Sequence, residues 1–316
     1  MNQKTIETFY IYLNSQQTAQ EYLYKCYQKI GEKDAESKSY RNCNAFLYYL
    51  QHGKKFYESG QKLDMALQPV LLFYGMGHLV KAVLLTKRPD YPESTTMMAH
   101  GVSSRKRKKK HYKFIDDEIK IQHKGLFPYM SEHLYHMKNF PFEKISMKRL
   151  FSLIPELVSL FSFHEEVYLI KIGKLGTTYL SFPETILDGY HLTKNSFVNR
   201  LTPYLPNIIN ISSENQKITF QLANSFIKQQ RGPFFIHMDQ TIYFPNERNA
   251  FLPISEIMVH YLLLYNLSMV SRYEAEWWGD LLVNKSEIDY PLITQFLNVT
   301  AKKIPFMLGE MLNNNL

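Results

Sequence analysis

The sequence predicts an α+β fold that is predominantly α-helical, in which N-terminal and C-terminal helices form one bundle and a small antiparallel sheet is inserted between them. Apolar residues recur at steps of three and four near both ends of the chain, which is typical of helices that face a core. Between residues 165 and 245, short apolar segments flank turn residues, which is typical of hairpins. With 45% apolar and 15% aromatic residues among 316, the chain can build a large core and is not of the disordered class.

The N-terminal region is predicted to be helical. Residues 5–29 suit one or two amphipathic helices broken by a polar stretch, and residues 39–59 suit a helix that Gly60 ends. The segment 64–87 is apolar on nearly every face and is predicted to be the central helix. Asp64 is its expected N-cap, Pro69 suits its first turns, and the small residues Gly75 and Ala82 would let another backbone approach closely.

The middle of the chain changes character twice. Residues 88–143 are rich in turns and short polar stretches, and a helix is predicted over 146–163, kinked or split at Pro155. Three hairpins are predicted after it, at 166–183 around the turn 173–176, at 207–222 and at 233–245.

From Ser255 the chain is predicted to be helical again, with one helix to Leu282 and another from Pro291 to Leu312. These helices are expected to return to the first bundle. The predicted domains are a helical bundle over 1–164 that carries a basic loop at 100–113, a β-rich insertion over 165–250, and the returning helices over 251–316.

The charge is concentrated in one place. The formal net charge is +8, and one run of six consecutive cations leaves only +2 for the rest of the chain. Adjacent like charges repel and stay solvated, so the run is expected on the surface. Two interpretations remain open, a solubilising loop and an element that binds phosphates or an acidic protein surface. The candidate anion-binding residues in the run are Arg105, Lys106, Arg107, Lys108, Lys109 and Lys110.

Several features favour a cytoplasmic protein. The only two cysteines, Cys26 and Cys43, resemble small buried apolar groups. The N-terminus has no apolar segment followed by a cleavage site. The most apolar windows, 70–85 and 257–270, are shorter than the roughly 20 residues that cross a bilayer, so they are predicted to be buried helices.

Common catalytic and cofactor motifs are missing from the sequence. Gly75 and Gly77 have a dinucleotide-type spacing but lie in a predicted helix, which favours core packing. His133 and His136 share a helical face without a third ligand, which favours a surface pair over a metal site. We therefore expect no cofactor and no metal.

Two groups of residues are candidates for a site. The first is His100 and Gly101, followed closely by Arg105: nearby cations would lower the pKa of the imidazole and supply phosphate contacts, although a loop histidine without a chemical role is the alternative. The second is Arg272, one helical turn after Ser268, which needs an acceptor at the end of an apolar helix. That acceptor is either a carboxylate or capping carbonyl of the fold, or a bound anion. The candidate supporting residues are His78, Gly101, Ser268, Tyr273 and Trp277.

Three segments resemble the YaaC-like proteins of Bacillus and related bacteria: 68–75 (QPVLLFYG), 91–110 with its basic run, and 267–277 with Arg272. The resemblance covers nearly the whole chain and implies no established activity. It implies a bacterial protein whose gene tends to lie beside that of IMP dehydrogenase, which makes purine metabolism a setting and IMP dehydrogenase a candidate partner.

The chain is more distantly similar to HEPN helical bundles, many of which are metal-independent ribonucleases with an arginine followed by four to six residues and a histidine. Arg105 and His111 have that spacing, and so do Arg231 and His237. The similarity makes His111 a further candidate catalytic residue, beside His100 and Arg105.

Three functions follow as hypotheses. The first, which we favour, is a non-catalytic binding or regulatory protein whose basic loop engages a nucleotide, a nucleic acid or an acidic partner protein. The second is a metal-independent ribonuclease, with His111 or His100 as base and Arg105 stabilising charge. The third is a purine-nucleotide-binding enzyme that uses Arg272 and His100. A homodimer is left open.

Overall fold

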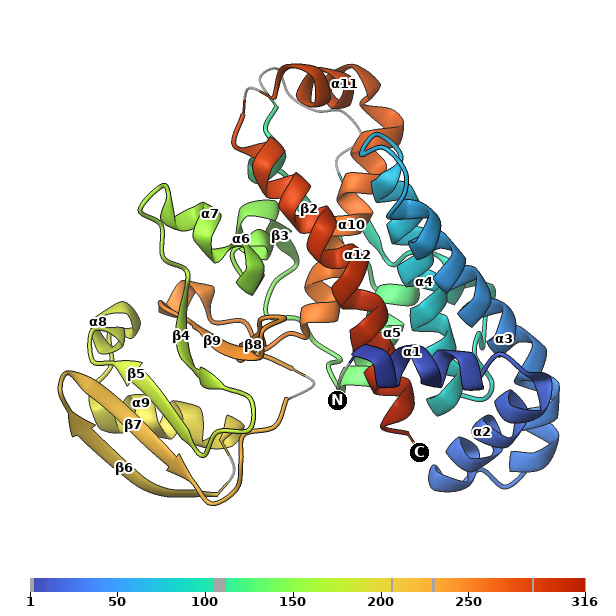
Figure 1. The fold of residues 1–316 in the computed structure, drawn as a ribbon, viewed down its shortest axis with the longest axis horizontal. Coiled ribbons are helices and arrows are strands. Elements are labelled where there is room, and N and C mark those ends of the chain that lie inside the picture. Colours follow the sequence, from blue (N-terminus) through green and yellow to red (C-terminus); the bar gives the residue numbers. More distant parts are fainter. Residues whose placement is uncertain (1–2, 105–111, 206, 229–230, 286, 316) are drawn as a thin grey trace. The chain divides into compact units, whose positions relative to one another are not determined.

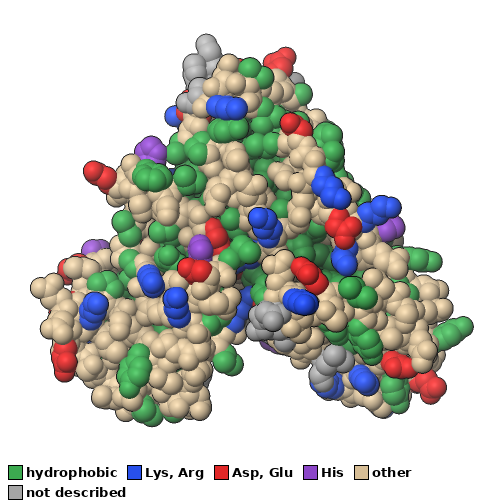
Figure 2. Space-filling view, viewed as in Figure 1, with side chains coloured by type: hydrophobic (Ala, Val, Ile, Leu, Met, Phe, Trp, Pro, Cys, Tyr) green, Lys and Arg blue, Asp and Glu red, His purple; other side chains and the backbone are tan. Residues whose placement is uncertain are grey.

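A computed structural model describes residues 3–104, 112–205, 207–228, 231–285 and 287–315 (Figure 1). The chain divides into two compact units, one formed by residues 1–147 and 260–316 and the other by residues 148–259. The run Arg105–Lys110 and the candidate base His111 lie outside the described residues. On the face that Figure 2 shows, the Lys and Arg side chains lie scattered among Asp and Glu, as expected for a nearly neutral remainder.

The first unit begins with four helices, α1 (Gln3–Tyr12), α2 (Gln16–Lys29), α3 (Ala35–Gly60) and α4 (Gln68–Lys87). Residues 5–29 thus form two helices, separated by a turn, and Ser15 caps the second of them by accepting a hydrogen bond from Thr18 N. Gly60 is the last residue of α3, as predicted.

The prediction of Asp64 as the N-cap of the central helix is wrong. Helix α4 begins at Gln68, and Asp64 instead closes the preceding turn, where its Oδ1 accepts a hydrogen bond from Ala66 N at 2.8 Å. Pro69 lies in the first turn of α4, where its missing N–H costs nothing.

Helices α3 and α4 run side by side in Figure 1 and approach closely at two glycines. A Cβ on Gly75 would lie 2.9 Å from the ring of Tyr57, and a Cβ on Gly53 would lie 2.7 Å from Leu79. The predicted role of Gly75 in close packing is confirmed. Of the described helices, α4 alone is long and apolar enough to cross a membrane, and 67% of that window is buried inside the protein, as in a core helix.

The segment predicted as turns, 88–143, contains more structure than expected. Three short strands, β1 (Val102–Ser104), β2 (Glu118–Ile121) and β3 (Lys144–Ser146), form an antiparallel sheet in the order β1-β2-β3. Helix α5 (Leu126–Tyr135) lies between β2 and β3, and the 3-10 turns Thr95–Met98 and Phe114–Asp116 flank β1 and β2. Strands of three or four residues leave no alternating pattern long enough to detect.

The last helices return to the first ones, as predicted. Helix α12 (Asp289–Asn313) accepts hydrogen bonds from Tyr10 Oη at Pro305 O (2.8 Å) and from Tyr22 Oη at Leu312 O (2.7 Å). The prediction of a single helix from Ser255 to Leu282 is wrong. This segment forms two helices, α10 (Glu256–Tyr273) and α11 (Ala275–Asn284), which are separated at Glu274.

The second unit opens with short helices. The predicted helix over 146–163 is split around Pro155 into α6 (Met147–Phe151), a 3-10 turn at Pro155–Leu157 and α7 (Val158–Ser162). Arg149 Nη2 donates to Asn249 O at 2.7 Å and Lys148 pairs with Glu166, so these residues belong with the β-rich unit. The unit boundary at residue 147 therefore precedes the expected one at 164.

Two three-stranded antiparallel sheets form the rest of this unit, in the orders β4-β9-β8 and β5-β7-β6. The hairpins predicted at 207–222 and 233–245 are confirmed as β6–β7 and β8–β9. The hairpin predicted around 173–176 is wrong, because β4 pairs with β9 and β5 pairs with β7. The strands are β4 (Leu169–Lys174), β5 (Tyr179–Pro183), β6 (Ile208–Glu214), β7 (Lys217–Leu222), β8 (Phe235–Ile236) and β9 (Thr241–Pro245).

Helices α8 (Ile186–Tyr190) and α9 (Lys194–Leu201), with 3-10 turns at Thr202–Tyr204 and Arg248–Ala250, complete the second unit. Its core is aromatic: Phe182, Tyr190, Phe197 and Phe244 are fully buried and contact one another edge to face or stacked.

Candidate functional site

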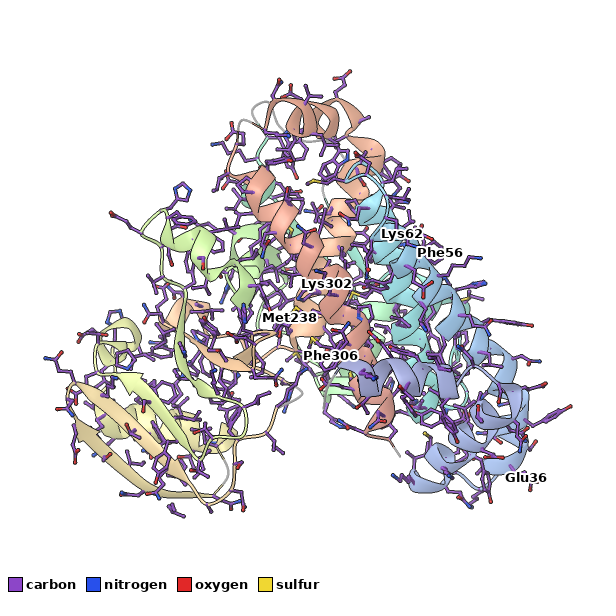
Figure 3. The ribbon with its side chains drawn as sticks, in the orientation of Figure 1. Glu36, Phe56, Lys62, Met238, Lys302 and Phe306 are labelled. Atoms are coloured by element: carbon purple, nitrogen blue, oxygen red, sulfur yellow. The ribbon has the colours of Figure 1, made fainter. Side chains whose placement is uncertain are left out.

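Aromatic and histidine side chains form a continuous series between α3 and α4 in the first unit. On α4, Tyr74 and His78 are four residues apart and share one face. On α3, the side chains of Tyr49, His52 and Phe56 lie on the face that is turned toward Tyr74 and His78. Figure 3 labels Phe56 on that helix. We name the series Tyr49, His52, Phe56, Tyr74 and His78 the ring ladder.

His78 is the centre of the ring ladder. Its ring stacks on Phe56, with centroids 5.6 Å apart and planes 14° apart, and meets the edge of His52 at 5.6 Å. The ring of Tyr49 lies 5.9 Å away on the α3 side, and Phe56 in turn stacks on Tyr74 at 6.3 Å. The ladder therefore runs from Tyr49 at one end to Tyr74 at the other.

The imidazole of His78 is neutral near pH 7. Its pKa is lowered to about 4, mainly by burial and to a smaller extent by the nearby charges of Lys81 and His52. Its Nδ1 is buried and has no hydrogen-bond partner in the described part of the chain. An unpaired buried ring nitrogen destabilises the fold, which is a reason to consider a role in binding.

A lysine lies at the Tyr49 end of the ring ladder. Lys81 Nζ is 5.7 Å from the centroid of the Tyr49 ring, within cation–π range. Burial lowers the pKa of this lysine from its ordinary value. Within the described ranges, no carboxylate forms an ion pair with Lys81.

His100 lies beside the other end of the ring ladder. Its ring meets the edges of Phe73 at 5.0 Å, Tyr265 at 5.6 Å and Tyr74 at 6.2 Å. Its backbone oxygen accepts hydrogen bonds from Tyr261 Oη at 3.0 Å and from Phe127 N at 3.1 Å. These two bonds hold the backbone at this residue in place.

Gly101 explains the sharp turn after His100. Its φ is +78°, and a Cβ there would lie 2.4 Å from Pro128 Cδ, so a side chain fits neither the backbone conformation nor the space. The supporting role predicted for Gly101 is thus to turn the chain from His100 into β1.

The pKa of His100 is lowered, which is the direction that the sequence led us to expect, and described groups outside the basic run contribute to the shift. Burial is the largest cause, followed by the positive charges of Arg272 and Lys81. The basic run, which we expected to lower this pKa, lies outside the described residues. The structure thus brings together two candidates from distant parts of the sequence, His100 and Arg272.

Arg272, in the last turn of α10, has a carbonyl acceptor and aromatic neighbours. Its Nε donates to Ser268 O at 2.8 Å, and its guanidinium lies 5.2 Å from the ring of Tyr273 and 6.0 Å from that of Tyr74. One of the two expected types of acceptor, a capping carbonyl of the helix, is therefore present. Among the residues that the structure covers, no carboxylate pairs with this arginine.

The remaining supporting residues have clear positions. Ser268 is fully buried and its Oγ donates to Tyr265 O at 2.8 Å, so only its backbone oxygen meets Arg272. Tyr273 is 66% exposed, and its ring is the outer neighbour of the guanidinium. Trp277 lies elsewhere: its Nε1 donates to Tyr112 O at 3.0 Å.

Tyr112 belongs to a second polar group that the sequence did not reveal. Its Oη donates to Asp117 Oδ2 at 2.9 Å, and Asn266 Nδ2 donates to the same oxygen at 2.9 Å. Asp289, fully buried, accepts from Phe114 N at 2.6 Å and from Ile115 N at 2.9 Å. We name this group, Tyr112, Asp117, Asn266, Trp277 and Asp289, the anchor, because it attaches residues 112–117 to α10, α11 and α12.

The other motif candidates do not form a site. His237 follows β8 and lies 2.9 Å from Asp239 Oδ1, while Arg231 is exposed, so this second arginine–histidine pair does not lie on a helix. His136 caps the end of α5 in a left-handed conformation, and His133 packs on Tyr129 at 4.2 Å. The described residues contain no group of three His, Cys, Asp or Glu side chains suited to a metal.

Sequence reasoning missed Lys81 and four members of the ring ladder. The signal was present in α4, where Tyr74, His78 and Lys81 recur at steps of four and three in an otherwise apolar helix. The partners on α3, Tyr49, His52 and Phe56, carry no such signal, because that helix is polar over much of its surface.

Comparison with known proteins gave one match. A family model described as YaaC-like Protein matches residues 11–312 of the chain, which confirms the resemblance noted from the sequence. No curated protein and no solved structure matches.

Proposed function

We propose, from the premise that this chain belongs to the YaaC-like family, that it is a non-catalytic binding or regulatory protein that takes a phosphate-bearing ligand beside Arg272 and His100. Purine nucleotides are the first ligands to test, because the family resemblance implies a setting in purine metabolism. The proposed location is the cytoplasm, where such nucleotides occur.

One observation carries the proposal: a half-buried arginine without a described carboxylate partner lies close to a neutral histidine among aromatic rings. A guanidinium offers several N–H donors in a fixed plane, which suits phosphate oxygens. A neutral imidazole adds one N–H donor without a second charge to desolvate. The exposed ring of Tyr273 and the partly exposed ring of Tyr74 offer surfaces for a base.

Binding without catalysis is supported by the serine hydroxyl one helical turn before Arg272. The Ser268 hydroxyl is buried and donates to a backbone oxygen, so it is held away from any ligand at Arg272. The same local geometry gives no reason to prefer the ribonuclease or the nucleotide-binding enzyme over a binding protein.

Thermal unfolding and calorimetry of the full chain with phosphate, pyrophosphate, AMP, GMP, IMP, ATP and GTP test the proposal. A specific ligand at 100 times its dissociation constant should stabilise the protein by about 2.7 kcal/mol. Arg272→Gln should weaken binding at least tenfold. Lys302→Gln, which removes an exposed cation of α12 labelled in Figure 3, should have no effect. Equal affinity of the Arg272→Gln protein for every bound compound would contradict the proposal.

The basic run remains a proposed contact to phosphates or to an acidic partner, with IMP dehydrogenase as the candidate that the family resemblance implies. A pull-down from cell extract with the intact protein, repeated after changing residues 105–110 to serine, tests it. Loss of an acidic partner would support this contact, and an unchanged set of partners would remove the run from the account.

A further inference from the structure

The ring ladder has a cation at each end. Lys81 Nζ lies 5.7 Å from the Tyr49 ring, and the Arg272 guanidinium lies 6.0 Å from the Tyr74 ring. The rings between them are in continuous contact through His78 and Phe56. Both cations act on the pKa of His100, so both charges lie within electrostatic range of that ring.

The two cations lie at different heights along helix α4. Tyr74, which meets Arg272, and Lys81 are seven residues apart on α4, a distance of about 10 Å along the helix axis at 1.5 Å per residue. Two phosphates joined through one bridging oxygen are too close together to match such a separation. A ligand that engages both ends needs anionic groups separated by part of a sugar-phosphate chain.

The surface between the cations reaches solvent. His52 is exposed, Tyr74 is 36% exposed, and Tyr49, Phe56 and His78 are partly exposed. In the part of the chain that the structure describes, neither Lys81 nor Arg272 has a carboxylate partner that a ligand would have to displace. Positive groups that follow a backbone, together with aromatic rings that contact bases, are the features of proteins that bind single strands.

Resting on the proposed function, we propose that the ring ladder with Lys81 and Arg272 binds a single-stranded oligonucleotide, with one backbone phosphate at each cation and bases against the exposed rings. Arg272 and His100 then hold the first phosphate, and Lys81 holds a later one. A mononucleotide occupies only the Arg272 end. A duplex keeps its bases paired and stacked, so it cannot place them on the rings of Tyr74 and His52.

Fluorescence anisotropy with the full chain tests the proposal, with 5′-phosphorylated adenylate oligomers of one, two and four nucleotides as competitors of a labelled strand. The tetranucleotide should bind at least tenfold more tightly than AMP. Lys81→Gln should remove that advantage and leave the affinity for AMP unchanged, whereas Arg272→Gln should weaken both. Lys302→Gln is the matched control.

Two further measurements separate a direct contact from a loss of structure. The slope of log affinity against log salt should fall by about 0.7 in Lys81→Gln, as expected when one phosphate contact of a single strand is removed. Tyr74→Leu should weaken the tetranucleotide about tenfold without changing the salt slope, because stacking on a ring is not a charge effect. Thermal unfolding shows that each variant is folded.

The outcomes distinguish this inference from the proposed function. If AMP and the tetranucleotide bind equally and Lys81→Gln changes neither affinity, the inference is overturned while phosphate binding at Arg272 stands. If a duplex binds as tightly as the single strand, the inference is also overturned. If no phosphate compound binds the intact protein, the proposed function falls and the inference falls with it.

Discussion

The anchor and the ring ladder are two polar regions of the same unit, and they differ in how their polar groups are satisfied. In the anchor, the carboxylates of Asp117 and Asp289 accept hydrogen bonds from side chains and from backbone N–H groups of residues 114 and 115. In the ladder region, Lys81 and Arg272 have aromatic neighbours but no carboxylate among the described residues. A buried polar group that is paired within the fold stabilises it, whereas one left without its partner is available to a ligand.

The largest expected effect is on the free energy of unfolding, and it tests the structural role of the anchor. Asp289→Ala removes the acceptor for two buried backbone N–H groups, so we expect the free energy of unfolding to fall by about 3 kcal/mol. Asp289→Asn, which keeps one acceptor oxygen, should lose less. Urea unfolding at neutral pH measures both, and an Ala variant as stable as the intact protein would show that the anchor is not structural.

The next prediction concerns the turn that presents His100. In Gly101→Ala, the positive φ and the contact of the new Cβ with Pro128 Cδ should lower the free energy of unfolding by about 2 kcal/mol. Phosphate affinity should fall with it, because His100 is displaced. Gly279→Ala is the control, since an added Cβ there meets nothing within 4 Å, and it should not destabilise the protein. If Gly101→Ala is as stable as the intact protein, the turn accommodates a side chain at this position and the prediction is wrong.

The pH dependence of stability tests the neutral ring at the centre of the ladder. The pKa of His78 is about 4 in the folded protein and near 6.5 in the unfolded chain, so below pH 6.5 the unfolded chain binds more protons. Stability should therefore fall as the pH drops from 6.5 to 4, by about 1 kcal/mol, less than the full shift because the ring keeps contact with solvent.

His78→Phe keeps a ring without a titrating group and should flatten this part of the curve. Exposed His123→Gln should leave it unchanged. Urea unfolding across this pH range gives the comparison. If the intact protein and His78→Phe show the same slope, the neutral state of His78 is not the source of the acid sensitivity.

The smallest expected effect on stability concerns Arg272, and it tests whether this arginine serves ligand binding and not the stability of the fold. Arg272→Gln should change the free energy of unfolding by less than about 1 kcal/mol, because the arginine pairs with no described carboxylate and its Nε bond is to a helix carbonyl. Thermal unfolding without ligand measures it, beside Lys302→Gln. A large loss would place Arg272 with the anchor as a structural residue.

Sequence patterns were reliable where the signal is local. The central helix α4, the end of α3 at Gly60, the division of the segment 146–163 at Pro155 and the hairpins β6–β7 and β8–β9 follow from periodicity, glycine, proline and turn residues. The hairpin expected around 173–176 failed because β4 and β5 find their partners in β9 and β7, which are far away in the sequence. Local pattern identifies a strand but does not choose its neighbour.

The candidate site shows the same division. His100 and Arg272 were identified singly, because a histidine before a turn glycine and an arginine at the end of an apolar helix are unusual in themselves. Lys81 and Tyr49 were missed, because a lysine on one helix and a tyrosine on another are ordinary residues until the helices pack together. Asp289 was missed for the same reason, since its partners, Phe114 and Ile115, lie on a distant segment.

The amino-acid sequence by itself determined the helical character of both ends, the strands between them and the concentration of charge in one short run, since each depends on neighbours along the chain. Only the tertiary structure decided which strands pair, which carboxylates are satisfied and which cations are left beside a series of rings. The physical reason is that side-chain contacts depend on distances in space, and the close approach of α3 to α4 at Gly53 and Gly75 sets those distances.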